Sequence, residues 1–118
     1  MASIKSVRQK SEKYEDLYMK WKIFYYLLAV EKSIGEMCFI FSDDKEKTEH
    51  YLGYTADWDE PYWIGCCDIK DGCGFQTAEE LVKTPVFDHK SLQERWDKVQ
   101  IESIDGLTLE EWRQNCYR

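Results

Sequence analysis

The sequence lacks the apolar segments that membrane and secreted proteins need. Its longest apolar run, residues 23–30, has eight residues, whereas a helix needs about 20 to cross a bilayer. No apolar stretch follows the basic N-terminal residues, so we expect no secretory signal, no membrane and a cytoplasmic location. The five cysteines are an odd number, which then indicates reduced thiols and no structural disulfide.

Catalytic and cofactor-binding motifs are also missing. The chain has no G-x-G-x-x-G, G-x-x-x-x-G-K-[ST], H-E-x-x-H or G-x-S-x-G pattern, so nucleotide enzymes, zincins and many serine hydrolases lose support. Cys66, Cys67 and Cys73 lack the C-x₂₋₄-C spacing of zinc knuckles. We therefore predict no metal and no cofactor. A small enzyme that pairs a cysteine with His50 or His89, or that uses two carboxylates, remains an alternative.

What is present indicates one folded domain. The 118 residues are 43% hydrophobic, 15% aromatic and 33% charged, a composition outside the disordered class. The two prolines fall in expected loops, and no repeat or linker divides the chain. We predict a mobile basic N-terminus over residues 1–10 and a single α+β domain over residues 11–118.

Charge is distributed unevenly along the chain. Residues 1–33 contain seven Lys/Arg and four Asp/Glu, whereas residues 34–118 contain nine Lys/Arg and nineteen Asp/Glu. Nucleic-acid binding usually requires a basic face on the fold, so the balance argues against direct contact with DNA or RNA. An acidic domain favours a basic protein partner, with a nucleic-acid mimic as a special case.

The first half of the chain combines helix and strand signals. Tyr14, Leu17 and Tyr18 have helical spacing, which predicts a short helix over residues 11–19. Residues 24–30 and 36–41 are rich in aromatic and branched side chains and predict two strands joined by a turn that closes at Gly35. One long helix over residues 11–30 is the alternative for the first of them. Residues 42–44 resemble a helix cap, and a helix is expected over residues 45–52, with His50 near its C-terminal end, followed by a buried strand over residues 63–69.

The second half has stronger local signals. Capping boxes of the form [ST]-x-x-[EQ] predict that three short helices begin at Thr77, Ser91 and Thr108. Residues 100–104 predict a short strand, and Asp105-Gly106 a turn. The predicted fold is α+β, with a three- to four-stranded, mainly antiparallel sheet and short capped helices packed on one face.

The most unusual segment is residues 57–63, which combines carboxylates and large aromatic rings around a proline. Aromatic residues on loops often form binding surfaces. We therefore predict a non-catalytic interaction domain, of accessory, immunity or inhibitor type, whose partner-binding residues are Asp57, Trp58, Asp59, Glu60 and Tyr62. Trp63 is expected in the core.

Overall fold

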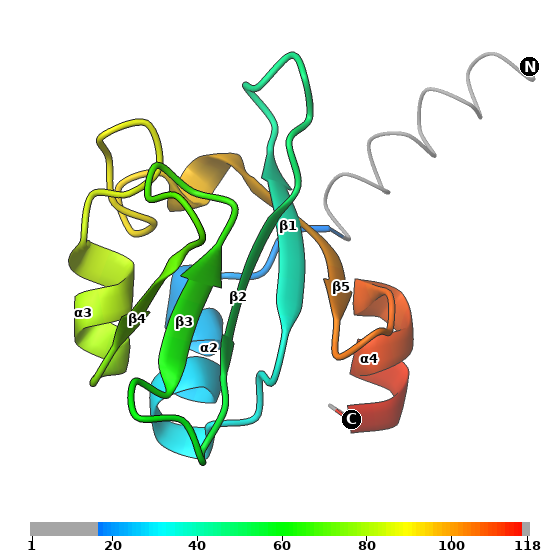
Figure 1. Ribbon diagram of the computed structural model, residues 1–118. Helices are drawn as coiled ribbons and strands as arrows, with labels where there is room; N and C mark the ends of the chain where they lie inside the picture. The colour runs from blue at the N-terminus through cyan, green and yellow to red at the C-terminus, as the bar shows by residue number, and fades with distance from the viewer. Residues whose placement is uncertain (1–16, 117–118) are drawn as a thin grey trace, which may run out of the picture.

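The computed structural model describes residues 17–116, which form a five-stranded antiparallel sheet with short helices (Figure 1). The strands are β1 (Met37–Phe41), β2 (His50–Tyr54), β3 (Tyr62–Gly65), β4 (Cys73–Phe75) and β5 (Val99–Ile104), in the spatial order β4-β3-β2-β1-β5. The predicted α+β class with an antiparallel sheet is confirmed. The sheet has one strand more than the predicted maximum of four, because β2 and β4 were not predicted as strands and the strand predicted over residues 24–30 does not form.

One face of the sheet builds the core. Met37, Phe39 and Phe41 alternate along β1 and are buried, as are Leu52 on β2 and Ile64 on β3. Because neighbouring residues of a strand point to opposite faces, the residues between them lie on the other face. The open face, as we call it, therefore carries Cys38, Tyr51, Gly53, Trp63, Gly65 and, paired with Trp63, Gly74.

The first helical segment corrects the strand predicted over residues 24–30. Helix α2 (Trp21–Tyr26) continues into a π-helical turn, η1 (Leu27–Glu31), which ends at Lys32 with φ 55°. Phe24, Leu27 and Leu28 are almost fully buried, and their i, i+3, i+4 spacing is that of one helical face. The alternative of a helix is right in type but not in extent, because residues 18–20 are not helical. The predictions for residues 1–10 and for most of residues 11–19 lie outside the described residues.

The helix predicted over residues 45–52 is also wrong. The Asp44 carboxylate accepts hydrogen bonds from the backbone N–H groups of Glu46 (3.0 Å) and Thr48 (3.1 Å). These bonds close a turn, after which the chain enters β2 at His50. An aspartate can cap a turn in the same way that it caps a helix, so the sequence of residues 42–44 is compatible with either a turn or a helix.

The strand predicted over residues 63–69 is confirmed only in part. It begins at Tyr62 and ends at Gly65, because Cys66 adopts φ 56°, which extended backbone does not allow. Cys66 is exposed and Cys67 half-buried, so the cysteines are not fillers of a buried strand.

Two of the three capping boxes begin α-helices. Both reciprocal hydrogen bonds are present at Thr77, where α3 (Ala78–Lys83) begins and ends before Pro85, and at Thr108, where α4 (Leu109–Cys116) begins. The Ser91 box also forms, but only turns and a 3-10 helix, η2 (Trp96–Lys98), follow it. The Gln93 N–H donates to the Val82 carbonyl oxygen of α3, and the α-helix predicted to begin at Ser91 is wrong.

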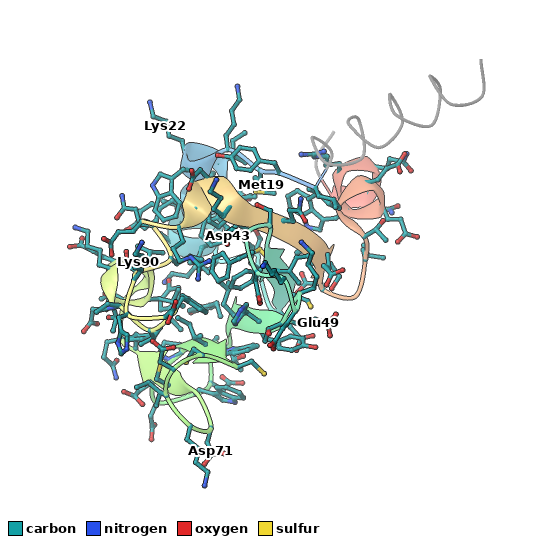
Figure 2. All side chains as sticks on the ribbon, turned by 90° about the horizontal axis from the view of Figure 1, so that it is seen from above. Met19, Lys22, Asp43, Glu49, Asp71 and Lys90 are labelled. Carbon is teal, nitrogen blue, oxygen red and sulfur yellow. The ribbon has the colours of Figure 1, made fainter. Side chains whose placement is uncertain are left out.

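The helices leave part of the sheet uncovered. Figure 1 shows α2 behind the sheet, α3 beside β4 and α4 beside β5, with no described helix in front of β2 and β3. Figure 2 shows the loop that carries Asp71 projecting away from the end of the molecule that carries Lys22. None of the helices formed by the described residues has the length and apolar character needed to cross a membrane.

Candidate functional site

The acidic–aromatic loop, residues 55–61, connects β2 to β3 and carries Asp57, Trp58, Asp59 and Glu60, all exposed. The Thr55 N–H donates to the Pro61 carbonyl oxygen (2.8 Å), and the Trp58 N–H donates to the Thr55 carbonyl oxygen (3.2 Å). The Gln76 side chain donates to the Asp59 carbonyl oxygen (2.9 Å). These bonds tie the loop to itself and to the segment after β4, so its side chains extend from a well-defined backbone.

The indole ring of Trp58 packs against a second indole ring, that of Trp63. The Trp58 side chain is 55% exposed, and the ring centroids of Trp58 and Trp63 lie 6.0 Å apart. The Trp63 indole N–H donates to the Thr55 hydroxyl oxygen (3.1 Å), which fixes the lower ring. Trp63 is half-buried on the open face rather than inside the core, which corrects the core position expected for it.

Tyr62 lies on the opposite face of β3. Its side chain is only 5% exposed, it belongs to the core cluster, and its ring packs 4.8 Å from that of Tyr54. A residue buried in this way cannot offer its ring to a partner at the surface. Four of the five predicted site residues, Asp57, Trp58, Asp59 and Glu60, therefore lie together on the loop. Tyr62 does not join them, and the aromatic ring beside Trp58 is that of Trp63.

A shallow groove of about 460 Å³ extends from these rings across β3 and β4. This tryptophan groove is lined by Trp58, Glu60, Trp63, Ile64, Gly65, Asp71, Gly72, Cys73 and Gly74. Gly74 lies opposite Trp63 in the strand register, and a Cβ atom there would come within 2.7 Å of the Glu60 Cβ. Gly74 thus makes room for the Glu60 side chain, and Glu60 and Asp71 add two carboxylates to the lining of the groove.

The open face continues with a pair of carboxylates. The ligand atoms of Cys38, Glu49 and Glu102 lie within 4.8 Å of one another. Desolvation, a hydrogen bond that the protonated Glu102 donates to Glu49, and the negative charge of Glu49 raise the pKa of Glu102, and burial followed by the charge of Glu49 raises the pKa of Cys38 to about 11. The Cys38 thiol is therefore protonated at neutral pH, and Glu49 and Glu102 are like charges held close together.

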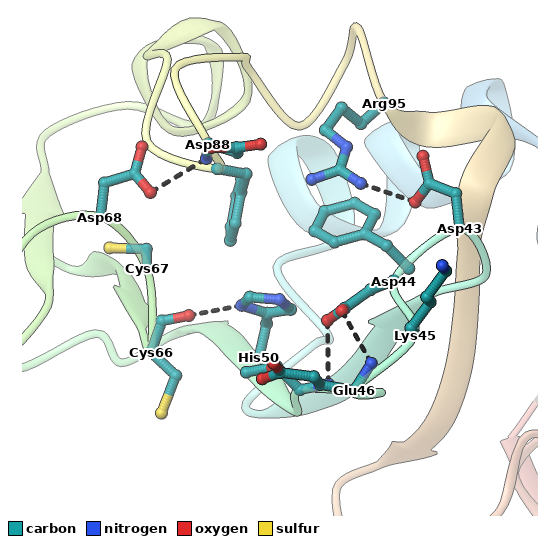
Figure 3. Close-up of a pocket in the computed structure, with 13 residues that line it drawn as sticks. Asp43, Asp44, Lys45, Glu46, His50, Cys66, Cys67, Asp68, Asp88 and Arg95 are labelled. Carbon is teal, nitrogen blue, oxygen red and sulfur yellow. Dashed lines mark hydrogen bonds and ion pairs between the residues drawn. The ribbon is translucent and has the colours of Figure 1, made fainter.

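The histidine cleft is a second hollow, of about 770 Å³, at the other end of β2 and β3 (Figure 3). It is lined by Phe41, Asp43, Asp44, Lys45, Glu46, Thr48, His50, Cys66, Cys67, Asp68, Phe87, Asp88 and Arg95. The Arg95 guanidinium lies 3.7 Å from the centre of the Phe41 ring and forms an ion pair with Asp43 (2.7 Å). Of the two cations that line this cleft, Lys45 and Arg95, Arg95 is thus already paired with an anion.

His50 is the imidazole side chain that lines this cleft. Its Nδ1 atom hydrogen-bonds to the Cys66 carbonyl oxygen, and its ring packs against those of Phe41 and Phe87 at 5.1 and 5.2 Å. Burial lowers the pKa of the imidazole below its ordinary value, so the ring is neutral at pH 7. A carbonyl oxygen can only accept, so the proton resides on Nδ1 and Nε2 is left as an acceptor.

The cleft does not form the Cys–His pair of the enzyme alternative. His50 contacts the backbone of Cys66 rather than its thiol, and Figure 3 shows the sulfur atoms of Cys66 and Cys67 pointing away from the imidazole. His89 lies in an exposed turn where its N–H donates to Asp68. The described residues of the cleft therefore offer a neutral base without a thiol nucleophile beside it.

The two hollows have different chemistry. The tryptophan groove combines exposed aromatic surface with unpaired carboxylates, whereas the carboxylates of Asp43, Asp44 and Asp68 in the histidine cleft already accept hydrogen bonds. The groove is therefore the stronger candidate for contact with a partner. No protein-family model, no curated protein and no solved structure matches this chain.

Proposed function

We propose that this protein is a cytoplasmic, non-catalytic interaction domain that binds a basic partner protein through its acidic–aromatic loop and tryptophan groove. The observation that carries the proposal is the exposed Trp58 ring, 55% accessible and supported by Trp63 in a loop of carboxylates. Exposed tryptophans on firm supports are frequent hot spots of protein interfaces. An accessory, immunity-type or inhibitor role would use such a surface.

Charge supports the basic character of the partner. Residues 34–118 contain nine Lys/Arg against nineteen Asp/Glu, and the groove places Glu60 and Asp71 beside the indole rings. A lysine or arginine side chain over Trp58 would gain a cation–π contact and would meet carboxylates at the same time. Arginine suits both contacts best, since its planar guanidinium stacks on rings and pairs with carboxylates.

The loop is also prepared for binding. Its backbone bonds and the bond from Gln76 hold it in place before any partner arrives. A surface that is ordered in advance loses less conformational entropy on association. This supports a role for the loop as a recognition surface rather than as a flexible connection.

A labelled arginine-rich peptide tests the proposal, with fluorescence anisotropy as the readout. We expect Trp58→Ser to weaken binding about thirtyfold, as loss of a hot spot of about 2 kcal/mol requires. The matched control is Tyr26→Ser, because Tyr26 is 51% exposed but lies on α2, away from the groove. Both variants should keep the urea midpoint of the parent, since exposed rings contribute little to folding.

The carboxylates are tested in the same assay. We expect the double variant Asp57→Asn/Asp59→Asn to bind more slowly and to lose part of the salt dependence that the parent shows. A peptide of equal length with glutamate in place of arginine should not bind. Equal affinity of the Trp58→Ser variant and the parent, or no binding of the arginine peptide at low salt, would overturn the proposal.

A further inference from the structure

The histidine cleft has the size of a site for a small molecule. Its volume of about 770 Å³ lies within the range of roughly 300–1,000 Å³ that is typical of ligand pockets. Separate parts of the chain line it, namely the end of β1, the turn before β2, the residues after β3 and residues 87–95. A ligand in the cleft would therefore contact segments that only the fold brings together.

The second nitrogen of the His50 ring is an acceptor without a partner. Nδ1 donates to the Cys66 carbonyl oxygen, and no hydrogen bond among the described residues involves Nε2. Every side-chain nitrogen or oxygen atom that is buried within the described residues has a partner, so Nε2 is open to solvent. Figure 3 shows it on the side of the ring away from Cys66, toward Asp44 and the interior of the cleft. A ligand in the cleft can therefore donate a hydrogen bond to Nε2.

The charges of the cleft favour a cation. Five carboxylates line it, against the two cations Lys45 and Arg95. Arg95 is already paired with Asp43 (2.7 Å), and Figure 3 shows Lys45 on the same side of the cleft as this ion pair. The carboxylates of Glu46 and Asp88 accept no hydrogen bond from the described part of the chain. A cationic ligand would therefore meet more negative than positive charge.

We propose that the histidine cleft binds a small aliphatic amine in its ammonium form, which donates hydrogen bonds to His50 Nε2 and to carboxylates of the cleft. The site does not depend on the proposed function, because the cleft shares no residue with the tryptophan groove. Loss of one site therefore leaves the other available for measurement.

An ammonium group suits these acceptors better than a guanidinium group does. It offers three N–H donors that point in different directions, whereas the five donors of a guanidinium group lie in one plane. Glu46 precedes β2 and Asp88 follows α3, so the acceptors surround the cleft rather than share a plane. Burial lowers the pKa of His50, and at pH 7 Nε2 thus retains the lone pair that an ammonium group requires.

Titration of the full chain with n-butylamine at pH 7 tests the site, with NMR spectra of the imidazole nitrogens as the readout. The ionic strength is held constant with sodium chloride, so that screening does not change during the titration. We expect saturable changes at Nε2 of His50 and none at His89, the other histidine of the chain. Tetramethylammonium, which is a cation without N–H donors, and butyrate, which is an anion, should produce neither.

A substitution of His50 tests the acceptor, with calorimetry as the readout. The amide N–H of His50→Asn can take the place of Nδ1 and keep the bond to the Cys66 carbonyl oxygen, but no acceptor remains at the position of Nε2. We expect binding of n-butylamine to weaken about tenfold, as loss of a hydrogen bond to a charged group requires. His89→Asn is the matched control and should bind like the parent.

Two double variants test the carboxylates and leave the imidazole in place. Glu46→Gln/Asp88→Asn removes two charges from exposed side chains of the cleft, and Asp57→Asn/Asp71→Asn removes two from exposed side chains outside it. We expect the first variant to bind n-butylamine about fivefold more weakly than the parent, and the second to bind like the parent. This comparison holds even where circular dichroism shows that His50→Asn does not fold.

Several outcomes would overturn the proposal. They are no saturable change with n-butylamine, an equal change with tetramethylammonium, full affinity in a folded His50→Asn variant, and equal losses in the two double variants. Nα-acetyl-lysine N-methylamide carries the same butylammonium group on a peptide unit. If it bound more tightly than n-butylamine, the cleft would take a lysine side chain of a protein and not a free amine.

Discussion

His50 illustrates how a few neighbours control the protonation of one residue. Desolvation of the half-buried ring favours the neutral form, and the positive charge of Arg95 acts in the same direction. The Cys66 carbonyl, Asp44 and Asp68 favour the charged form but do not outweigh burial. The folded state therefore binds a proton at His50 less readily than the unfolded chain does.

This difference predicts how the free energy of unfolding depends on pH. The folded pKa lies below the ordinary value of 6.5, so the contribution to stability is complete above that value and is lost as the pH falls through it toward the folded pKa. We expect urea midpoints to decrease between about pH 7.5 and about pH 5.5. His50→Gln should flatten this decrease, while His89→Gln, at an exposed turn, should not.

Other titrating groups do not account for the expected difference in pH dependence between the His50→Gln and His89→Gln variants. The pKa values of Asp44 and Asp68 lie below 3.8 because backbone N–H groups donate to them, so these residues titrate outside the window. Glu102 has a raised pKa and acts with the opposite sign, but it is present in both histidine variants. An unchanged slope in His50→Gln would show that the imidazole does not carry the effect.

At the scale of elements, the sequence correctly predicted those helices, strands and turns that are determined by interactions between residues close in sequence. Helices α3 and α4 begin where Thr77 and Thr108 form capping boxes with Glu80 and Glu111, and α3 ends before Pro85, as its ring requires. The strand at residues 100–104 and the turn at Asp105-Gly106 are also confirmed, because β5 and its turn occupy these positions.

Two of the three wrong elements depended on distant contacts. Residues 24–30 are apolar enough for a strand or for a helix, and only packing of Phe24, Leu27 and Leu28 against the sheet selects the helix. Residues 45–49 are exposed and so have no apolar face to hold a helix after Asp44. The local sequence does not show where the core lies. It therefore cannot decide between strand and helix for residues 24–30, or between turn and helix after Asp44.

The candidate site shows the same division. The composition of residues 57–63 identified the loop but not which side chains face outward. Tyr62 is buried as the first residue of β3, and it is Trp63 rather than Tyr62 that contacts Trp58. The histidine cleft was not predictable, because its walls come from segments around residues 41–50, 66–68 and 87–95 that only the fold brings together.

Two glycines of the open face offer a test of the sheet packing. A Cβ atom at Gly53 would lie 2.1 Å from the Gly35 carbonyl oxygen and 2.7 Å from the Trp63 ring, whereas one at Gly65 would meet only the Tyr51 Cβ, at 3.8 Å. We expect Gly53→Ala to lower the free energy of unfolding by about 1–3 kcal/mol or more, as overpacking does. Gly65→Ala should change it by less than about 1 kcal/mol.

Chemical denaturation of both variants measures the difference directly. The Gly65→Ala variant serves as the control for the intrinsic effect of alanine on a strand. Equal midpoints for the two variants would show that the backbone of Gly35 and the Trp63 ring are not packed against Gly53 as described.

At the scale of the whole molecule, negative charge exceeds what the described ion pairs balance. Lys83 with Glu79 and Arg95 with Asp43 are paired, but the formal net charge is −7. Glu49 and Glu102 lie together on the open face, and Glu60 and Asp71 border the groove beside it. The carboxylates on such a surface repel one another, and a cationic partner or added salt would reduce this repulsion.

This excess predicts that Glu102→Gln stabilises the protein at neutral pH. The raised pKa of Glu102, caused first by desolvation and then by Glu49, means that folding favours its protonated form, and glutamine is a neutral group of similar shape. Like charges on adjacent strands cost roughly 0.2–1 kcal/mol, so we expect a gain within that range. The control is Glu36→Gln, an exposed glutamate outside the carboxylate pair.

Salt separates this repulsion from other effects of the substitution. Sodium chloride should raise the Tm of the parent, because at about 0.15 M it screens exposed charges beyond about 8 Å and weakens closer pairs. The increase should be smaller in Glu102→Gln, where one source of repulsion is gone, and unchanged in Glu36→Gln. If thermal unfolding gave the same salt response in all three proteins, the carboxylate pair would not be a source of the repulsion, and the acidic face would lack the local charge density that a basic partner could neutralise.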